Sequence, residues 1–336
     1  MTQLTLLIQE LSQVADARRR AVAMAARLSF DETMTGKLAI AVTEAATNII
    51  KHARDGCMLM RPLAGTGEGG IEVIAFDRGP GIANLAESMR DGRSTAGTAG
   101  SGLGAISRLT SHFDIYSRSG VGTALRFEVW ARPRSEQLPA LQVGAVCVAK
   151  PGQTVVGDSW TAVHRDLRHV ILVADGLGHG PDAAAASGAA TRALDENAHL
   201  EPAAIMTALH QALSVTRGAA AAIVVLHSGR EAGTFCGVGN IASMASVDGK
   251  PRHLVSFNGI VGHKMHKVRE FDFPFPAHAL LVMHSDGVDT HWKLENYPGL
   301  ESRHPSLVAA VLYRDHARGL DDATIVGIRN TARAHT

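Results

Sequence analysis

The 336-residue sequence has little of several features that mark particular functions. Aromatic residues make up only 4% of the chain, so platforms for stacking nucleic-acid bases are not expected. A net charge of +1 gives no support for nucleic acid or an anionic membrane as the main partner. The longest apolar run, "AAAAIVVL", is far too short to span a bilayer. These absences predict a protein with no nucleic-acid partner and no membrane partner.

Cysteine is scarce as well. Cys57, Cys147 and Cys236 lie far apart and form no CxxC pair, which favours reduced, structural thiols. The opening "MTQLTLLIQE" has no basic leader, and the arginines at 18–20 come after the apolar residues, which is the wrong order for a signal peptide. The sequence therefore predicts a soluble, cytoplasmic protein.

The composition that remains suits a globular protein of two domains. Apolar residues make up 46% of the chain and charged residues 19%, a balance that buries a core and stays soluble. The segment "ARPRSEQLPA" has two prolines, mixed charge and little periodicity, as expected of a linker. We expect domains at 1–131 and 141–330, joined by a linker at 132–140.

The first half predicts helices packed on strands. An alanine-rich helix follows the strand-like "LTLLIQ", and Asp31 is placed to cap a long helix over 32–53. Apolar residues recur in that helix at helical spacing, at Leu38, Val42, Ala45 and Ile49. Strands are predicted at 57–60, 70–76, 113–118 and 122–130.

The second half predicts more strands than helices. Two helices are expected between 180 and 215, and a third at 304–316. Strands are predicted at 142–149, 169–174, 220–227, 232–237, 241–247, 252–257, 278–284 and 323–328. Because many strands are consecutive, the pattern favours an α+β fold with antiparallel sheets covered by helices, not a doubly wound parallel sheet.

Three motifs in the first half suit a nucleotide site. Glu44 and Asn48 are four residues apart, so they share one helix face and can hold a water or hydroxyl beside a metal ion. In "FDRGPGI" a strand ends at Asp77, which can accept a hydrogen bond from an exocyclic amine such as that of adenine. "GSGLG" at 100–104 opens a helix, where unpaired N–H groups favour phosphate. The order of all three motifs is more specific than any one of them.

These motifs resemble those of the GHKL (Bergerat-fold) ATPases, and most closely the RsbT/RsbW-like serine/threonine switch kinases. "EAATNIIKHA" is similar to the family's N-box, and "DRGPGI" and "GSGLGAISRL" are similar to its two glycine boxes. The resemblance covers about residues 5 to 130 and implies an α/β sandwich that binds Mg-ATP. It implies that Glu44 is the general base that takes the proton of an attacking hydroxyl, and that Asn48 is the Mg²⁺ ligand. It also implies nucleotide contacts at Asp77, Gly79, Gly81, Ile82, Gly102, Leu103, Gly104 and Thr123.

In the second half, aspartates recur at predicted strand ends, at Asp158, Asp175, Asp286 and Asp321. Carboxylates this far apart in sequence can converge only if their strands pair, and converged carboxylates need a cation. All-oxygen ligands suit Mg²⁺ or Mn²⁺, and two such ions can activate water against a phosphate ester. The alternative is that Asp-Gly simply marks turns.

These segments resemble the SpoIIE/PPM metal-dependent serine/threonine phosphatases, with the RsbX-type members nearest. "VGDSW", "VADGLGHGPDAA", "HSDGV" and "DDATIV" are similar to the family's aspartate motifs. The resemblance implies a β-sandwich flanked by helices, with Asp175 bridging two Mn²⁺ or Mg²⁺ ions and the Gly176 carbonyl as an added ligand. Asp158, Asp286 and Asp321 would hold one ion or the other, and Asp322 would not touch a metal. No arginine matches a phosphate clamp.

Together the resemblances predict a bifunctional signalling enzyme, a probable kinase joined to a phosphatase. Its expected substrate is a partner protein of the STAS, anti-anti-sigma type, acting on a downstream regulator or sigma factor. One alternative is a phosphatase whose first domain only senses ATP or sequesters a partner. Another is a non-enzymatic anti-sigma module, which the intact aspartates and glycines disfavour.

Overall fold

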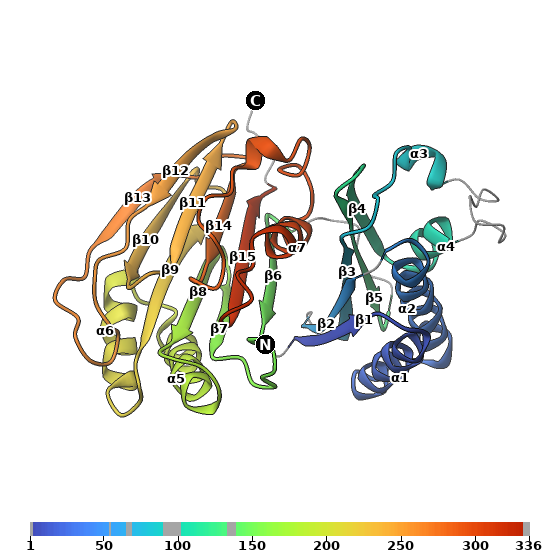
Figure 1. Cartoon of the computed structure of the whole chain (residues 1–336). Helices are drawn as coiled ribbons and strands as arrows, with labels where there is room; N and C mark the ends of the chain where they lie inside the picture. The colour runs from blue at the N-terminus through green and yellow to red at the C-terminus, as the bar shows by residue number, and fades with distance from the viewer. Residues whose placement is uncertain (1–2, 54, 65–68, 90–101, 133–138, 332–336) are drawn as a thin grey trace. The chain divides into compact units, whose positions relative to one another are not determined.

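The computed structural model describes residues 3–53, 55–64, 69–89, 102–132 and 139–331. The chain divides into two compact units, Met1–Gln137 and Leu138–Thr336 (Figure 1). Each unit has its own sheet or sheets and its own apolar core, so each is described by itself.

The first unit contains one five-stranded antiparallel sheet, ordered β1-β2-β3-β5-β4. Its strands are β1 (Leu4–Ile8), β2 (Gly56–Ala64), β3 (Gly69–Asp77), β4 (His112–Arg118) and β5 (Gly122–Trp130). The helices are α1 (Leu11–Arg27), α2 (Glu32–His52), α3 (Leu85–Ser88) and α4 (Gly102–Leu109). The predicted helices and strands of this half are confirmed.

The helices α1, α2 and α4 lie over one face of this sheet (Figure 1). As the sequence predicts, Asp31 caps α2, because its Oδ1 accepts a 2.7 Å hydrogen bond from the Met34 N–H. The apolar stripe of α2 is buried and packs against the inward side chains of the strands, such as Met58, Val73 and Phe127. This packing leaves the polar residues Glu44 and Asn48 of α2 beside the start of α4.

The second unit contains two five-stranded antiparallel sheets, ordered β13-β10-β9-β8-β7 and β12-β11-β14-β15-β6. Their strands are β6 (Leu141–Val148), β7 (Asp158–Arg165), β8 (Arg168–Gly176), β9 (Ala219–His227), β10 (Ala232–Val238), β11 (Ala242–Val247), β12 (Lys250–Leu254), β13 (Glu270–Pro274), β14 (Leu280–His284) and β15 (Ala323–Asn330). The helices are α5 (Pro181–Asn197), α6 (Pro202–Leu213) and α7 (Pro305–His316), with a short 3₁₀ turn at Leu294–Asn296. A proline starts each helix, where its missing N–H would have no partner in any case.

The two sheets of this unit pack face to face, and helices cover their outer faces (Figure 1). The core between the sheets includes Trp160, Phe235 and Met283, all buried. Helices α5 and α6 cover the first sheet, and α7 packs on β6 and β15 of the second. The α+β architecture with a helix-flanked β-sandwich is confirmed.

Two strands of this unit have no counterpart in the sequence prediction. Both β7 and β13 lie at the edges of their sheet, where one side of the strand faces solvent. Their side chains are correspondingly mixed, with "DSWTAVHR" in β7 and "EFDFP" in β13. Both segments mix charged, polar and apolar residues and have no continuous apolar run, so their sequence pattern does not distinguish them from loops.

The three cysteines lie in the described part of the chain, are buried and form no disulfide with one another. Burial raises the pKa of each thiol to about 12, so they remain protonated. Among the residues that the structure describes, no helix combines the length and apolar character that crossing a bilayer requires.

A chain of ion pairs crosses the sheet of the first unit. Glu72 accepts hydrogen bonds of 2.6 Å from both Arg61 and Arg126, and Arg126 also pairs with Glu128. Glu128 accepts a further bond of 2.8 Å from the Trp130 indole. Burial raises the pKa of Glu128, but its hydrogen bond with His112 and the charge of Arg126 outweigh burial and lower that pKa to about 2.

This shift predicts acid sensitivity of the first unit. The folded pKa of Glu128 lies below its ordinary value of 4.5, so its stabilisation is complete above that pH and is lost as pH falls toward about 2. The loss of unfolding free energy is on the order of 3 kcal/mol once Glu128 is fully protonated. Hydrogen exchange of β4 and β5 peptides in the full chain, compared between pH 5 and pH 3, measures it. Glu128→Gln should flatten the dependence, and an equally steep fall in that variant would contradict the assignment.

Candidate functional site

In the first unit, the helix pair Glu44 and Asn48 lies beside the start of α4. A Cβ placed on Gly102 would lie 3.2 Å from Asn48 Oδ1 and 3.5 Å from Glu44 Oε2. Residues more than fifty positions apart are therefore neighbours, and the start of α4 lies beside a carboxylate and a carboxamide. Leu103 packs against the core, and Gly104 is buried. Gly100 and Ser101, the first residues of the "GSGLG" motif, fall outside the described residues.

A second group of predicted residues gathers at the end of β3. Asp77 Oδ1 accepts hydrogen bonds from the N–H groups of Gly79, at 2.8 Å, and Thr123, at 3.3 Å. Gly81 has a φ of +67°, and a Cβ there would lie 2.0 Å from the Arg118 carbonyl oxygen. The turn after Asp77 therefore requires glycine at this position.

Ser117 is a residue of this region that the sequence did not single out. Its Oγ accepts a 2.8 Å hydrogen bond from the Ile82 N–H and lies 2.8 Å from Thr123 Oγ1. It thus joins the loop after Asp77 to the hairpin of β4 and β5. A serine in a strand carries no sequence signal of this role, because its partners are distant in the chain.

In the second unit, two of the four predicted aspartates are direct cross-strand partners. Asp158 begins β7 and Asp175 lies near the end of β8, and their Cα atoms pair in the antiparallel register. The two carboxyls lie close enough for each to shift the pKa of the other. Asp158 is only 3% exposed, and its Oδ2 accepts a 2.6 Å bond from Ser285 Oγ.

The electrostatics show that these carboxyls repel one another. Burial, opposed in part by the Ser285 hydrogen bond, raises the pKa of Asp158 to about 7. Burial and the charges of Asp158, Asp286 and Asp321 raise the pKa of Asp175 to about 9. Burial and then Asp321 also raise the pKa of Asp286. Because the ionisation of Asp158, Asp175 and Asp286 is disfavoured in this way, the ionised form of the site needs a cation.

The four aspartates do not all converge to coordination distance. Within the described ranges, no three His, Cys, Asp or Glu side chains form a group that could hold one ion. Asp286 is held by a 2.8 Å bond from Asn240 Nδ2, and Asp321 Oδ1 accepts from the Asp322 N–H at 2.9 Å. The structure therefore places Asp286, just after β14, and Asp321, just before β15, within charge range of Asp175.

The loop after Asp175 is packed closely. A Cβ on Gly176 would lie 2.1 Å from the Ala183 carbonyl oxygen, so only glycine fits there. The Gly176 N–H bonds to the Gly157 carbonyl at 3.3 Å, which ties this loop to the start of β7. His179 is exposed at the tip of the same loop.

Asp322 binds two backbone segments, a role that the sequence only partly indicated. Its Oδ1 accepts from the Lys150 N–H at 2.7 Å and its Oδ2 from the Gly157 N–H at 2.8 Å. Both carboxylate oxygens are therefore engaged by backbone, and they fix the residue that precedes Asp158.

We expect Asp322→Ala to leave these two buried N–H groups without their acceptor. The expected cost is about 1–3 kcal/mol of unfolding free energy, with a roughly ten- to hundredfold loss of any activity that depends on Asp158. Asp322→Asn keeps one acceptor and should be intermediate. Urea unfolding and steady-state kinetics measure both effects, with the exposed Asp195→Asn as the matched control. Wild-type behaviour of Asp322→Ala would show that Gly157 needs no such anchor.

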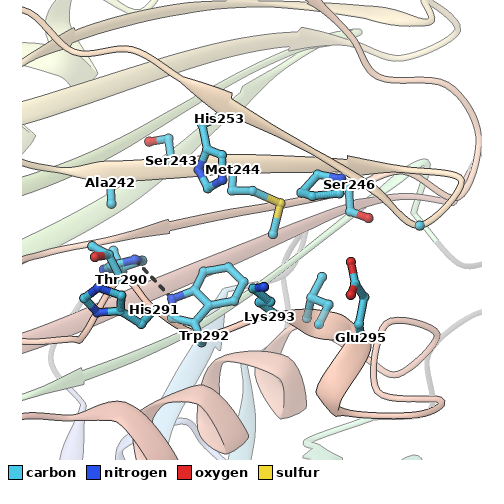
Figure 2. A pocket seen from close by; sticks show the side chains of 14 residues that line it. Ala242, Ser243, Met244, Ser246, His253, Thr290, His291, Trp292, Lys293 and Glu295 are labelled. Carbon is cyan, nitrogen blue, oxygen red and sulfur yellow. Dashed lines mark hydrogen bonds between the residues drawn. The ribbon is translucent and has the colours of Figure 1, made fainter.

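A separate cavity of about 460 Å³ lies on the outer face of the second sheet (Figure 2). Met244 and Trp292 form much of its apolar wall, and His253, His291 and Lys293 are among its polar residues. The Trp292 indole N–H donates to His284 Nε2 at 3.3 Å, and His284 Nδ1 donates to the Ser285 carbonyl at 2.9 Å. Burial lowers the pKa of His284, so it stays neutral as this tautomer requires. Trp292 thus packs near the "SDGVDT" loop, through its bond to His284.

The folds and motifs define a protein of two classes in one chain, a Bergerat-type ATPase sandwich followed by a PPM-type β-sandwich. Residues 7–129 match the family described as Histidine kinase-like ATPase domain, and residues 165–330 match Stage II sporulation protein E (SpoIIE). The chain belongs to the family of RsbT through its first unit, and it joins this RsbT-like kinase domain to a SpoIIE/RsbX-like phosphatase domain.

Individual relatives agree with this assignment. The chain is 34% identical to the serine/threonine-protein kinase RsbT of Bacillus subtilis over 119 residues, which is 35% of this chain and 90% of RsbT. It is 27% identical to the phosphoserine phosphatase RsbX of the same organism over 141 residues, 42% of this chain and 71% of RsbX. A crystal structure of RsbX in complex with magnesium shares the fold, with a TM-score of 0.50 and 22% identity, over 58% of this chain and 98% of that one.

Proposed function

We propose that the second unit removes phosphate from phosphoserine or phosphothreonine of a partner protein. The observation that carries this proposal is the cross-strand pair of the buried Asp158 and the half-buried Asp175, with Asp286 and Asp321 adding further negative charge. Such a set of carboxylates has no structural advantage in an apolar sandwich, since each buried charge is costly. It suits a site that is completed by cations.

The donor chemistry fits two hard divalent ions. Oxygen ligands only are available, from Asp158, Asp175, Asp286, Asp321 and the Gly176 carbonyl, which suits Mg²⁺ or Mn²⁺. Such ions, when bound, lower the pKa of a coordinated water and neutralise the charge of a phosphate ester. The magnesium in the RsbX structure supports this choice. The chain's own part is to hold the carboxylates in place through Ser285, Asn240 and backbone N–H groups.

We propose that the first unit binds Mg-ATP and phosphorylates the same kind of partner. The neighbouring positions of Glu44, Asn48 and Gly102 support it, because they combine a general base, a metal ligand and a helix start suited to phosphate. Asp77, with Gly79, Gly81, Ile82 and Thr123, would receive the adenine. Leu103 and Gly104 would continue the phosphate loop. Catalysis would rest mainly on positioning and charge neutralisation.

The two activities act in opposite directions, so together they would set the phosphorylation state of one switch protein. The relatives RsbT and RsbX are a kinase and a phosphoserine phosphatase, which supports a single partner for both units. We propose a STAS-domain protein of the anti-anti-sigma type as this partner. The division into 1–131, a linker at 132–140 and 141–330 would separate the two activities.

One experiment tests the proposal. The full chain is incubated with radiolabelled ATP, Mg²⁺, Mn²⁺ and a candidate STAS-domain protein, as wild type, Glu44→Ala and Asp175→Ala. We expect stable labelling of the STAS protein by Asp175→Ala, transient labelling by wild type and none by Glu44→Ala. Equal, stable labelling by wild type and Asp175→Ala would refute the phosphatase. Absence of labelling by Asp175→Ala, with ATP still bound, would leave the first unit as a nucleotide sensor.

A further inference from the structure

Arg217 lies in the loop between α6 and β9, and the backbone of this loop is fixed against the loop that follows Asp175. The Leu177 N–H donates to the Gly218 carbonyl at 3.0 Å. On the other side of Arg217, Thr216 Oγ1 donates to the Leu213 carbonyl at 2.7 Å and accepts from the Gly218 N–H at 3.0 Å. The Cα of Arg217 is therefore held beside the aspartate loop by bonds on both sides.

The side chain of Arg217 extends over that same loop. Its Nη2 donates to Asp182 Oδ2 at 2.6 Å, and its Nη1 would lie 3.3 Å from a Cβ placed on Gly178. The two side chains of the ion pair are 53% and 67% exposed. An ion pair this exposed contributes little to stability, so Arg217 can leave Asp182 and bind a ligand at a small cost in free energy.

Arg217 can supply positive charge for binding a phosphate group near the aspartates. Positive charge beyond that of the proposed ions would further stabilise a phosphate dianion at the entrance. The Arg217 guanidinium pairs with Asp182, at the first turn of α5, and lies beside Gly178 in the loop that follows Asp175. This planar group can donate two parallel N–H bonds to phosphate oxygens.

We propose that Arg217 binds the phosphate group of the substrate, exchanging the Asp182 carboxylate for phosphate oxygens. Asp182 is then a positioning residue that keeps the guanidinium over the Asp175–Gly180 loop when no substrate is bound. This inference rests on the phosphatase function proposed above. It supplies the phosphate-binding arginine for which the sequence offered no match.

The test uses the full chain with Mn²⁺, two substrates and inorganic phosphate. We expect Arg217→Ala to raise KM roughly ten- to hundredfold for both p-nitrophenyl phosphate and a phosphoserine peptide, with a smaller change in kcat. Calorimetry should show weaker binding of inorganic phosphate by a similar factor. Arg217→Lys keeps the positive charge but lacks the two parallel N–H donors of the guanidinium, so its KM and phosphate affinity should be intermediate. Arg230→Ala, at an exposed turn between β9 and β10, is the matched control.

Asp182 provides a second comparison. Asp182→Ala should raise KM by less than Arg217→Ala, leave kcat unchanged and be rescued by Asp182→Glu. If wild type is active while Arg217→Ala keeps its KM and its phosphate affinity, the inference is wrong and the phosphatase function stands. If wild type hydrolyses neither substrate with Mn²⁺, the proposed function is wrong and the inference falls with it.

Discussion

Asp175→Asn is expected to lose at least about a thousandfold of Mn²⁺-dependent phosphatase activity if Asp175 holds both ions as proposed, since a shared ligand contributes several kcal/mol of transition-state stabilisation. A second readout is the stability of the protein. Mn²⁺ should raise the Tm of the wild-type second unit, because a ligand that binds only the folded state stabilises it. This rise should be absent in Asp175→Asn.

The same substitution should not destabilise the metal-free protein. Burial, and then the charges of Asp158, Asp286 and Asp321, raise the pKa of Asp175 to about 9, so at neutral pH the metal-free fold carries the cost of protonating this carboxyl, and a neutral amide avoids that cost. Calorimetry in EDTA measures this, with Asp195→Asn, an exposed change on α5, as the control. A clear loss of metal-free stability in Asp175→Asn, or an unchanged Mn²⁺ effect on Tm, would show that Asp175 is a structural residue.

Glu44→Gln is expected to reduce phosphoryl transfer to the partner by about 10²–10⁴-fold, the usual contribution of a general base. Nucleotide binding should persist, because Asn48 and the start of α4 are unchanged. The Glu44 carboxylate lies near Gly102, and a glutamine amide of nearly the same shape fits there without new contacts. Single-turnover labelling of the partner and equilibrium titration with a fluorescent ATP analogue separate the two effects.

Glu32→Gln, in the exposed first turn of the same helix, is the matched control for Glu44→Gln. It should transfer phosphate as wild type does. Loss of ATP binding in Glu44→Gln would mean that the carboxylate serves the nucleotide site itself. Full transfer activity would mean that another group accepts the proton.

The sequence by itself determined what local patterns can determine. The stripe on α2 and the Asp31 cap depend on residues three or four apart, so a 21-residue helix was predictable from periodicity alone. The glycine motifs and Asp-Gly turns carried the family resemblance. At such positions the local backbone conformation and close packing allow few residue types, so the motif is visible in the sequence. Gly81 and Gly176 illustrate this, since no side chain fits at either position.

Only the tertiary structure decided which distant residues meet. Ser285 reaches Asp158 across 127 residues, and Asp322 reaches Gly157 across 165, through cross-sheet contacts that no local pattern encodes. Arg217 is an ordinary surface arginine in the sequence and becomes a phosphate-binding candidate only because its loop is bonded to Leu177. The edge strands β7 and β13 escaped prediction because each mixes charged, polar and apolar residues without a continuous apolar run. Periodicity reports burial along one element, whereas a site depends on the register between elements, which is set by the packing of the whole sandwich.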